Sequence, residues 1–166
     1  MNRSLQPTIR PAAKEDLPVL LDIIREIFHS YDMAFDPEND FPDLMAFDHH
    51  YPEGQRELYV MEYGSEVIGC GGLQTDREGI PYLYRVYIAS SLQGFGYGKQ
   101  LVRFLIEEAF RYHSYVYLWS DTRFTKAHKL YTELGFTHDG STRPLHDVNK
   151  SYEWCYELYQ QNYVTP

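Results

Sequence analysis

The segment that most constrains the fold of this chain is residues 82–105, YLYRVYIASSLQGFGYGKQLVRFL. Its first eight residues are rich in aromatic and β-branched side chains, which is typical of a strand. From Gly98 onward the apolar residues recur at helical spacing instead, at Leu101, Val102, Leu105, Ile106, Ala109 and Phe110. The segment therefore predicts a strand, a loop with three glycines in five residues, and a helix that begins where the loop ends.

The composition of this loop favours an anion site. Gly94, Gly96 and Gly98 carry no Cβ atom, so backbone N–H groups there can approach a ligand closely. The free N–H groups and the positive dipole end of a helix N-terminus favour an anion such as a pyrophosphate. The alternative is a tight turn without a ligand, but three glycines at a strand-to-helix junction favour phosphate binding.

The spacing of the loop is Gln-x-x-Gly-x-Gly, with Gln93, Gly96 and Gly98 at the defining positions. It resembles the acyl-CoA pyrophosphate loop of the GNAT superfamily of N-acetyltransferases, whose pattern is Arg/Gln-x-x-Gly-x-Gly/Ala. The resemblance implies acetyl-CoA as co-substrate, bound by the loop, by the strand before it and by a later helix. The residues implied in cofactor binding are Val86, Tyr87, Ile88, Gln93, Gly94, Phe95, Gly96, Tyr97, Gly98, Lys99, Phe124 and Tyr131.

A second element of the same family follows the loop. Residues 127–136, AHKLYTELGF, resemble the pattern Ala-x-x-Leu-Tyr-x-x-x-Gly-Phe at every defining position. Tyr131 matches the tyrosine that protonates the departing CoA thiolate. Residues 9–12 and 15–17 are also similar to the opening of many GNAT chains, so the resemblance extends over nearly the whole chain. It implies one N-acetyltransferase domain, residues 1–166.

Two positions depart from the family pattern. Many members carry asparagine seven residues before the tyrosine, where it touches the pantetheine arm of CoA, but this chain has Phe124. A carboxylate base is frequent near the start of the central strand, where this chain has Tyr82. Asp121, which ends the strand after the long helix, is predicted as catalytic with Tyr131. Other candidate bases are Tyr82 and Tyr84 on one face of the central strand, and Asp76 and Glu78 in the turn before it.

The rest of the chain predicts an α/β fold of the α+β type. Strands are expected at residues 8–10, 57–63, 67–73, 82–89, 115–119, 137–138 and 152–158, and helices at 17–28, 98–110, 124–134 and, briefly, near 44–47. The strand–helix–strand unit makes 82–89 and 115–119 parallel, whereas short connections make other neighbours antiparallel. The resemblance implies a mixed, mostly antiparallel central sheet of six to seven strands, with a parallel splayed pair and about four flanking helices.

Three local features add detail to this outline. Gly69, Gly71 and Gly72 predict a bulge or close packing within their strand. Pro and Gly residues break residues 31–55, a segment that covers the acceptor site in the GNAT fold. The adjacent His49 and His50 in this segment are interpreted as part of a solvated loop, and no metal site is expected.

Composition limits the partners. A chain of 166 residues with 43% apolar residues suffices for one domain with a full core. The net charge of −9 argues against nucleic acid and anionic membranes and mildly favours a cationic substrate, as do sixteen tyrosines that can line a pocket. No secretory signal or membrane span is evident, and Cys70 and Cys155 are interpreted as buried reduced thiols, so a cytoplasmic protein is expected. A homodimer is left open.

The sequence therefore predicts an enzyme that transfers an acetyl group from acetyl-CoA to a primary amine of a small acceptor, by direct attack in a ternary complex. One alternative is a non-catalytic acyl-CoA sensor on the same fold. Another is a dinucleotide-binding oxidoreductase, but the loop is Gly94-x-Gly96-x-Gly98 rather than Gly-x-Gly-x-x-Gly.

Overall fold

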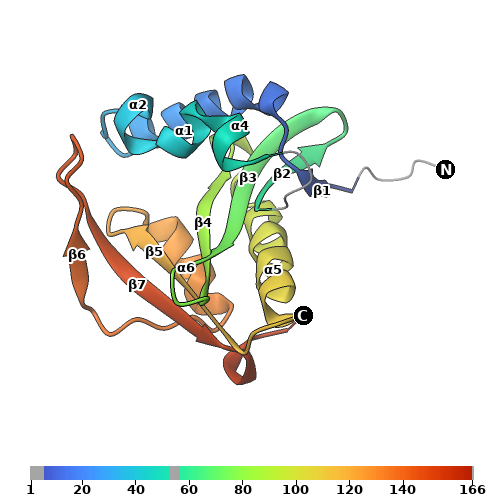
Figure 1. The fold of residues 1–166 in the computed structure, drawn as a ribbon, viewed down its shortest axis with the longest axis vertical. Helices are drawn as coiled ribbons and strands as arrows, with labels where there is room; N and C mark the ends of the chain where they lie inside the picture. The colour runs from blue at the N-terminus through green and yellow to red at the C-terminus, as the bar shows by residue number, and fades with distance from the viewer. Residues whose placement is uncertain (1–5, 53–56, 166) are drawn as a thin grey trace. The chain divides into compact units, whose positions relative to one another are not determined.

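The computed structural model describes residues 6–52 and 57–165 (Figure 1). Its strands are β1 (Thr8–Pro11), β2 (Leu58–Tyr63), β3 (Glu66–Thr75), β4 (Pro81–Ile88), β5 (Tyr115–Asp121), β6 (Thr142–Pro144) and β7 (Tyr152–Tyr159). They form one sheet in the order β1-β2-β3-β4-β5-β7-β6. β4 and β5 are parallel, whereas β1–β2, β2–β3, β5–β7 and β6–β7 are antiparallel. The prediction of a mixed, mostly antiparallel sheet with a parallel pair is confirmed.

The chain divides into two compact units, which are described separately. Unit 1 comprises Met1–Gly72 and Arg85–Leu101, and unit 2 comprises Leu73–Tyr84 and Val102–Pro166. Strands β3 and β4 and the long helix α5 (Tyr97–Phe110) contribute residues to both units. The prediction of a single domain over residues 1–166 stays a prediction.

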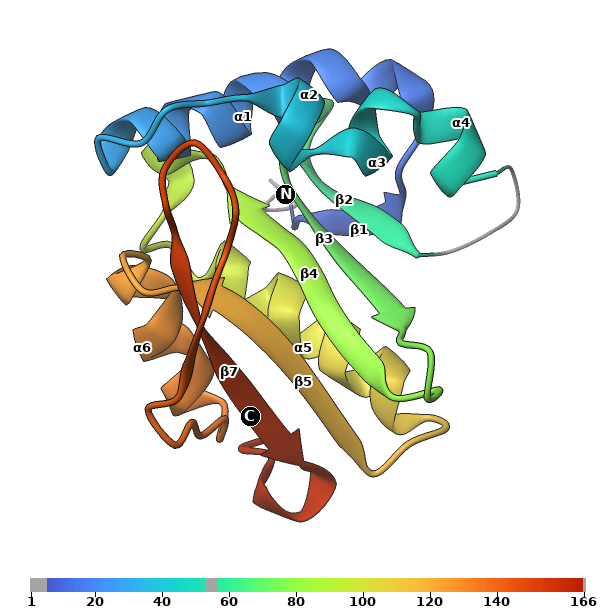
Figure 2. The same cartoon turned by 60° about the vertical axis from the view of Figure 1, so that its left-hand side comes forward.

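Unit 1 contains helix α1 (Leu17–Ser30) and three short helices, α2 (Pro37–Asp40), α3 (Pro42–Met45) and α4 (Phe47–His50), which lie close to one another in Figures 1 and 2. One face of α1 is apolar and buried, at Leu20, Ile23, Ile24, Ile27 and Phe28. Proline stands at the first position of α2 and of α3, where its missing N–H costs nothing. The single short helix expected near residues 44–47 is thus wrong in detail, because Phe41 and Ala46 interrupt the helical backbone between α2, α3 and α4.

The core of unit 1 holds the end of β4 and the start of α5 in place. Met61, Ile68, Ile88 and Leu101 form a buried cluster, against which Ile9, Leu92 and Tyr97 pack. The pairing of β2 with β3 shifts between Met61 and Glu62, where β3 advances from Gly69 to Val67. Ile68 is therefore the extra residue of a β-bulge beside Gly69, as the cluster of glycines predicts.

Unit 2 is built on the long antiparallel pair of β5 and β7. Val116, Leu118 and Ser120 on one face of β5 are buried, whereas the alternating Tyr115, Tyr117 and Trp119 are half-exposed. Helix α6 (Thr125–Glu133) ends at Leu134 and Gly135, whose φ of +100° lets the chain leave the helix as predicted.

Several expectations need correction. The closing strand expected at residues 137–138 is only an isolated bridge from Thr137 to Glu157, and the edge strand is β6 instead. Cys155 is half-buried because β7 presents it on the open face of the sheet, whereas Cys70 is buried as expected. Gly54, which was predicted to break the chain, and Gln55, the last residue of the segment 31–55, lie outside the described residues. In the part of the chain that the structure describes, no helix has both the length and the apolar character needed to cross a membrane.

Candidate active site

The glycine loop (residues 93–98) lies in unit 1, one short turn after the end of β4, and two hydrogen bonds fix its start. The N–H of Ala89 donates to the carbonyl of Ile68 (2.9 Å), and the side-chain amide of Gln93 donates to the carbonyl of Ile88 (3.0 Å). One 3₁₀ turn at Ser90–Leu92 joins the two points. Gln93 therefore closes the loop onto the end of the strand, which gives the first position of the sequence motif a structural role.

Glycine is required at positions 94 and 96 because of the backbone conformation there and not because of packing. Their φ angles are +87° and +86°, in the left-handed region. A Cβ atom on either would meet nothing within 4 Å, so the space over the loop is open. The first helical hydrogen bond after the loop runs from the N–H of Gln100 to the carbonyl of Gly96 (3.0 Å). The N–H groups of the first turn have no carbonyl partner within the helix, and with the helix dipole they favour an anion here.

The loop itself carries two aromatic side chains, Phe95 and Tyr97. The ring of Phe95 is 68% exposed and stacks on Tyr97 with 6.3 Å between ring centroids. Tyr97 in turn contacts Tyr63 of β2 at 5.8 Å. Lys99 lies in the same first turn of α5. An exposed ring and a lysine beside this candidate anion site suit a ligand that carries both a planar base and phosphates.

The central strand segment Val86, Tyr87 and Ile88 ends β4 within unit 1. Ile88 is buried in the core, and the ring of Tyr87 lies 6.5 Å from that of Phe41. A Cβ atom on Gly69 would come within 2.4 Å of the carbonyl oxygen of Tyr87, so only glycine permits this close approach to β3. The residue before the segment, Arg85, has a φ of +53° although it lies within a strand.

Tyr131 and Phe124 lie in unit 2, on or next to α6. Tyr131 is 4% exposed, and its ring contacts those of Phe136 (5.7 Å) and Tyr156 (5.6 Å). Phe124 caps the start of α6, where its N–H donates to the carbonyl of Asp121 (3.0 Å). The ring of Tyr131 is thus fixed by packing, which suits a residue that has to present its hydroxyl in one direction.

One turn before Tyr131, the buried His128 shares a hydrogen bond of 3.1 Å with the hydroxyl of Ser120. Its ring stacks on that of Tyr156 at 5.3 Å and contacts Trp154 at 5.0 Å. Burial lowers the pKa of His128 below its ordinary value, which keeps the ring neutral at pH 7. His128 therefore supports the packing of α6 as an uncharged group.

Asp121, at the end of β5, is 7% exposed and holds an ion pair within unit 2. Its carboxylate accepts from Arg123 at Nε (2.8 Å) and Nη2 (2.6 Å), and the same Nη2 donates to Ser151 (2.5 Å). Burial alone would raise the pKa of Asp121, but the hydrogen bonds and charge of Arg123 outweigh it and leave the pKa below its ordinary value. This carboxylate is ionised, with both oxygens engaged.

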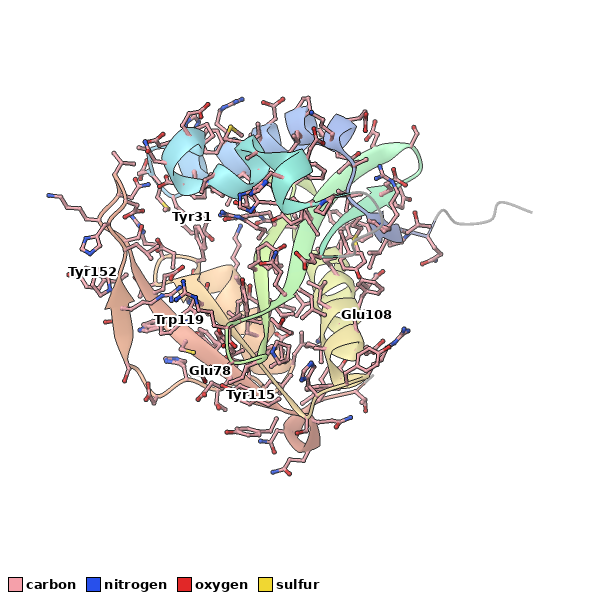
Figure 3. The ribbon with its side chains drawn as sticks, in the orientation of Figure 1. Tyr31, Glu78, Glu108, Tyr115, Trp119 and Tyr152 are labelled. Atoms are coloured by element: carbon pink, nitrogen blue, oxygen red, sulfur yellow. The ribbon has the colours of Figure 1, made fainter. Side chains whose placement is uncertain are left out.

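A hollow of about 420 Å³ lies on the open face of the sheet in unit 2, and Trp119, one of its lining residues, is labelled in Figure 3. We call it the aromatic hollow; its lining residues are Thr75, Asp76, Arg77, Tyr82, Tyr117, Trp119 and Arg143. The rings of Tyr82 and Tyr117 lie 5.7 Å apart, as the parallel register of β4 and β5 dictates. The guanidinium of Arg143 lies 3.9 Å from the centre of the Trp119 ring.

Asp76 supplies a negative charge to the aromatic hollow. The hydroxyl of Tyr117 donates to Asp76 Oδ2 (3.0 Å), and the N–H groups of Glu78 and Ile80 donate to Oδ1 (both 2.9 Å). The Ile80 N–H, with the other donors, holds the pKa of Asp76 below its ordinary value. Burial and the bond to Asp76 raise the pKa of Tyr117 to about 12, so its proton stays in place at neutral pH.

The structure thus brings some predicted residues together and leaves others untested. Asp76 and Tyr82 share the aromatic hollow, Tyr84 contacts Tyr82 at 5.7 Å, and Glu78 contributes its backbone to the turn of Asp76. The sequence interpretation overlooked Tyr117, Trp119 and Arg143. Tyr117 and Trp119 lie two residues apart on a strand that was predicted to run parallel to the strand of Tyr82 and Tyr84. The two-residue period of a strand and the predicted strand direction could therefore have identified them. Because the glycine loop belongs to unit 1 and Tyr131 to unit 2, their meeting in one site stays a prediction.

Comparisons with known proteins agree with this architecture. YjgM of Escherichia coli K12, an uncharacterized N-acetyltransferase, is 28% identical over 138 residues, which are 80% of this chain and 83% of that protein. An N-acetyltransferase from Staphylococcus aureus Mu50 is 22% identical, with a TM-score of 0.74 over 93% of this chain and 99% of that one. YncA of Salmonella typhimurium, whose structure holds its cofactor acetyl-CoA, is also 22% identical, with a TM-score of 0.69 over 97% and 98%.

The family comparison decides the assignment. The model of the acetyltransferase (GNAT) family matches residues 21–136, which include the glycine loop and the tyrosine-bearing helix α6. This match goes against the dinucleotide-binding alternative. Since it spans well over half of the 166 residues, the chain belongs to the GNAT family of acetyltransferases.

Proposed function

We propose that this protein transfers an acetyl group from acetyl-CoA to the primary amine of a small cationic acceptor, by direct attack in a ternary complex. The observation that carries the proposal is the glycine loop. It has two left-handed glycines, open space above them and the N-terminus of a 14-residue helix behind them. Such a loop suits the pyrophosphate of CoA. The presence of acetyl-CoA in the YncA structure supports the same donor here.

Acetyl transfer requires a hydrogen-bond donor to the thioester oxygen, an acid for the departing thiolate and a base for the acceptor amine. The thioester oxygen gains negative charge as the amine attacks, and a backbone N–H of Val86, Tyr87 or Ile88 is our candidate donor to it. The CoA thiolate leaves most easily if it is protonated, and Tyr131 is our candidate acid. The acceptor amine must first lose a proton, because a lysine-like amine has a reference pKa near 10.

The acceptor class follows from the aromatic hollow and from total charge. Three aromatic rings and the ionised Asp76 suit an ammonium group, since cations are attracted to aromatic faces. Trp119 already holds one cation of this chain, the guanidinium of Arg143. The net charge of −9 draws cations toward the protein in general. Since Arg77 and Arg143 line the hollow as well, the support for a small cationic amine comes from the aromatic rings, Asp76 and the net charge of the chain, and not from the summed charge of the hollow.

Two carboxylates compete for the role of general base. Asp121 is a candidate because it ends strand β5, but its oxygens are engaged by Arg123 and it is only 7% exposed. Asp76 also accepts hydrogen bonds at both oxygens, from Tyr117, Glu78 and Ile80, but it lines the aromatic hollow. Both have a lowered pKa and are ionised at pH 7, so accessibility rather than charge distinguishes them. We propose both as candidates for a direct comparison.

The first expected result concerns the cofactor. CoA should bind and raise the unfolding temperature, because a ligand at about one hundred times its dissociation constant adds roughly 2.7 kcal/mol to stability. NAD should give no comparable shift. Thermal unfolding with each ligand measures this, and a larger shift with NAD than with CoA would refute the proposed donor. Release of free CoA in the presence of a library of amines then identifies the acceptor and separates an enzyme from a sensor.

The second expected result separates the two candidate bases. Asp76→Asn should lower kcat/KM for the amine about 10-fold near pH 7. This loss is smaller than full acid–base assistance would give, because some of the amine is already deprotonated without a base. The deficit should shrink as the pH approaches the pKa of the amine, where no base is needed. Asp121→Asn should instead lower thermal stability, since it breaks the ion pair with Arg123. The opposite pattern of pH–rate profiles would assign the base to Asp121.

A further inference from the structure

Arg85 combines a strained backbone with a heavily anchored side chain. Its φ of +53° places a non-glycine residue in the left-handed region inside strand β4. Asp32 and Lys150 also have positive φ, but they lie outside helices and strands, where such angles are tolerated. A conformation of this kind persists only when the surroundings determine it, and it clusters at functional sites.

The anchor of the Arg85 side chain is Asp43 in helix α3, within unit 1. Arg85 Nη2 lies 2.5 Å from Asp43 Oδ1 and its Nε 3.3 Å from Asp43 Oδ2, so the two planar groups face each other as a fork. The same Nη2 donates to the carbonyl of Asp40 (3.1 Å). The guanidinium lies 4.3 Å from the centre of the Phe41 ring. These contacts fix the side chain in three directions.

The surroundings make this pair rigid. Both side chains are largely buried, at 21% and 18% exposure, and the hydroxyl of Tyr51 donates to Asp43 as well (2.5 Å). Phe41 is 1% exposed and packs against Phe28, Phe35 and Tyr87. Burial alone would raise the pKa of Asp43, but its bonds with Arg85 and Tyr51 keep the pKa below its ordinary value. The carboxylate is therefore a stable partner at neutral pH.

The backbone of Arg85 is held from the opposite side. The thiol of Cys70 in β3 donates to the carbonyl of Arg85 (3.2 Å). Burial raises the pKa of this thiol to about 12, so it remains a protonated donor. Side chain and carbonyl are thus fixed independently, and the peptide that follows, with the N–H of Val86, has little freedom to rotate.

We propose that Asp43 and Arg85 are positioning residues for acetyl transfer: they hold β4 in its left-handed kink and thereby aim the N–H group of Val86 at the thioester oxygen. The next N–H, that of Tyr87, faces the sulfur of Cys70 instead. The inference rests on the proposed function, because it takes the N–H of Val86 as the oxyanion donor. On this proposal α2 and α3 contribute to catalysis, because they carry the residues that anchor Arg85 of strand β4. An N–H that is misdirected by a small rotation loses most of its catalytic value.

The test uses Asp43→Asn and Arg85→Lys, which keep size or charge but weaken the fork. Each should lower kcat about 10-fold and leave the dissociation constant of CoA within about twofold, since the interaction forms in the transition state. The matched control is Asp16→Asn, which weakens the other fork of unit 1, between Asp16 and Arg10 (both bonds 2.8 Å). The control should lower thermal stability but leave kcat nearly unchanged.

A second readout requires no acceptor. In ¹⁵N-labelled protein, the amide resonance of residue 86 should shift with acetyl-CoA but not with CoA, because only the former carries the carbonyl. Asp43→Asn should abolish this acetyl-dependent shift while calorimetry shows unchanged CoA affinity. If the parent protein binds CoA but shows no such shift, the oxyanion assignment and this inference both fail. If the shift and kcat survive in both variants, only the positioning role is overturned; if CoA does not bind at all, the proposed function itself fails.

Discussion

Replacement of Gly96 by valine is expected to weaken CoA binding about 100-fold or more while the protein stays folded. The glycine loop can cradle a pyrophosphate only if its backbone N–H groups approach the phosphate oxygens, and a branched side chain would stand between them. Each hydrogen bond to a charged group is worth about 1.5–3 kcal/mol, so loss of two accounts for this factor. Isothermal calorimetry with CoA measures the change.

The chain offers a matched control for this variant. Gly140 has a φ of +85°, nearly that of Gly96, and a Cβ atom on it would also meet nothing within 4 Å. Gly140→Val should therefore suffer the same backbone strain, roughly 1–2 kcal/mol, without touching the loop. If Gly96→Val and Gly140→Val bind CoA equally well as folded proteins, the pyrophosphate site is misplaced.

Replacement of Tyr131 by phenylalanine is expected to lower kcat about 100-fold, the low end of the range for acid–base assistance, because the CoA thiolate is already a fair leaving group. The ring is fixed by Phe136 and Tyr156, so removal of the hydroxyl should leave the packing of α6 intact. The KM for acetyl-CoA should change little, since proton transfer occurs only in the transition state. Steady-state kinetics measure both constants, with circular dichroism as the test of folding.

Tyr156→Phe is the matched control for that prediction. Tyr156 is 2% exposed, lies in the same aromatic cluster and loses the same single atom. Its turnover should stay within about twofold of the parent, which corresponds to only ~0.4 kcal/mol of barrier. Equal losses in the two variants would mean that the hydroxyl of Tyr131 acts through packing, and Tyr131 would then leave the list of catalytic candidates.

The local elements were predictable because their signals are local. The change of hydrophobic period at Gly98 marks the start of α5 to within one residue of Tyr97. Gly135 marks the end of α6 for the same kind of reason, since the left-handed residue after a helix is usually glycine. The region of α2 to α4 was predicted poorly because three four-residue helices are too short to show a period.

What the sequence by itself determined about this protein is its order of elements, its glycine loop and its family, because each depends on residues close together in the chain. Only the tertiary structure decided which distant residues meet. No periodicity relates Asp43 to Arg85, which are 42 positions apart and form a buried fork, or Asp76 to Tyr117, which are 41 apart and share a hydrogen bond. Such pairs depend on strand register and on how the chain folds back, and these are set by the packing of the whole core rather than by any one segment.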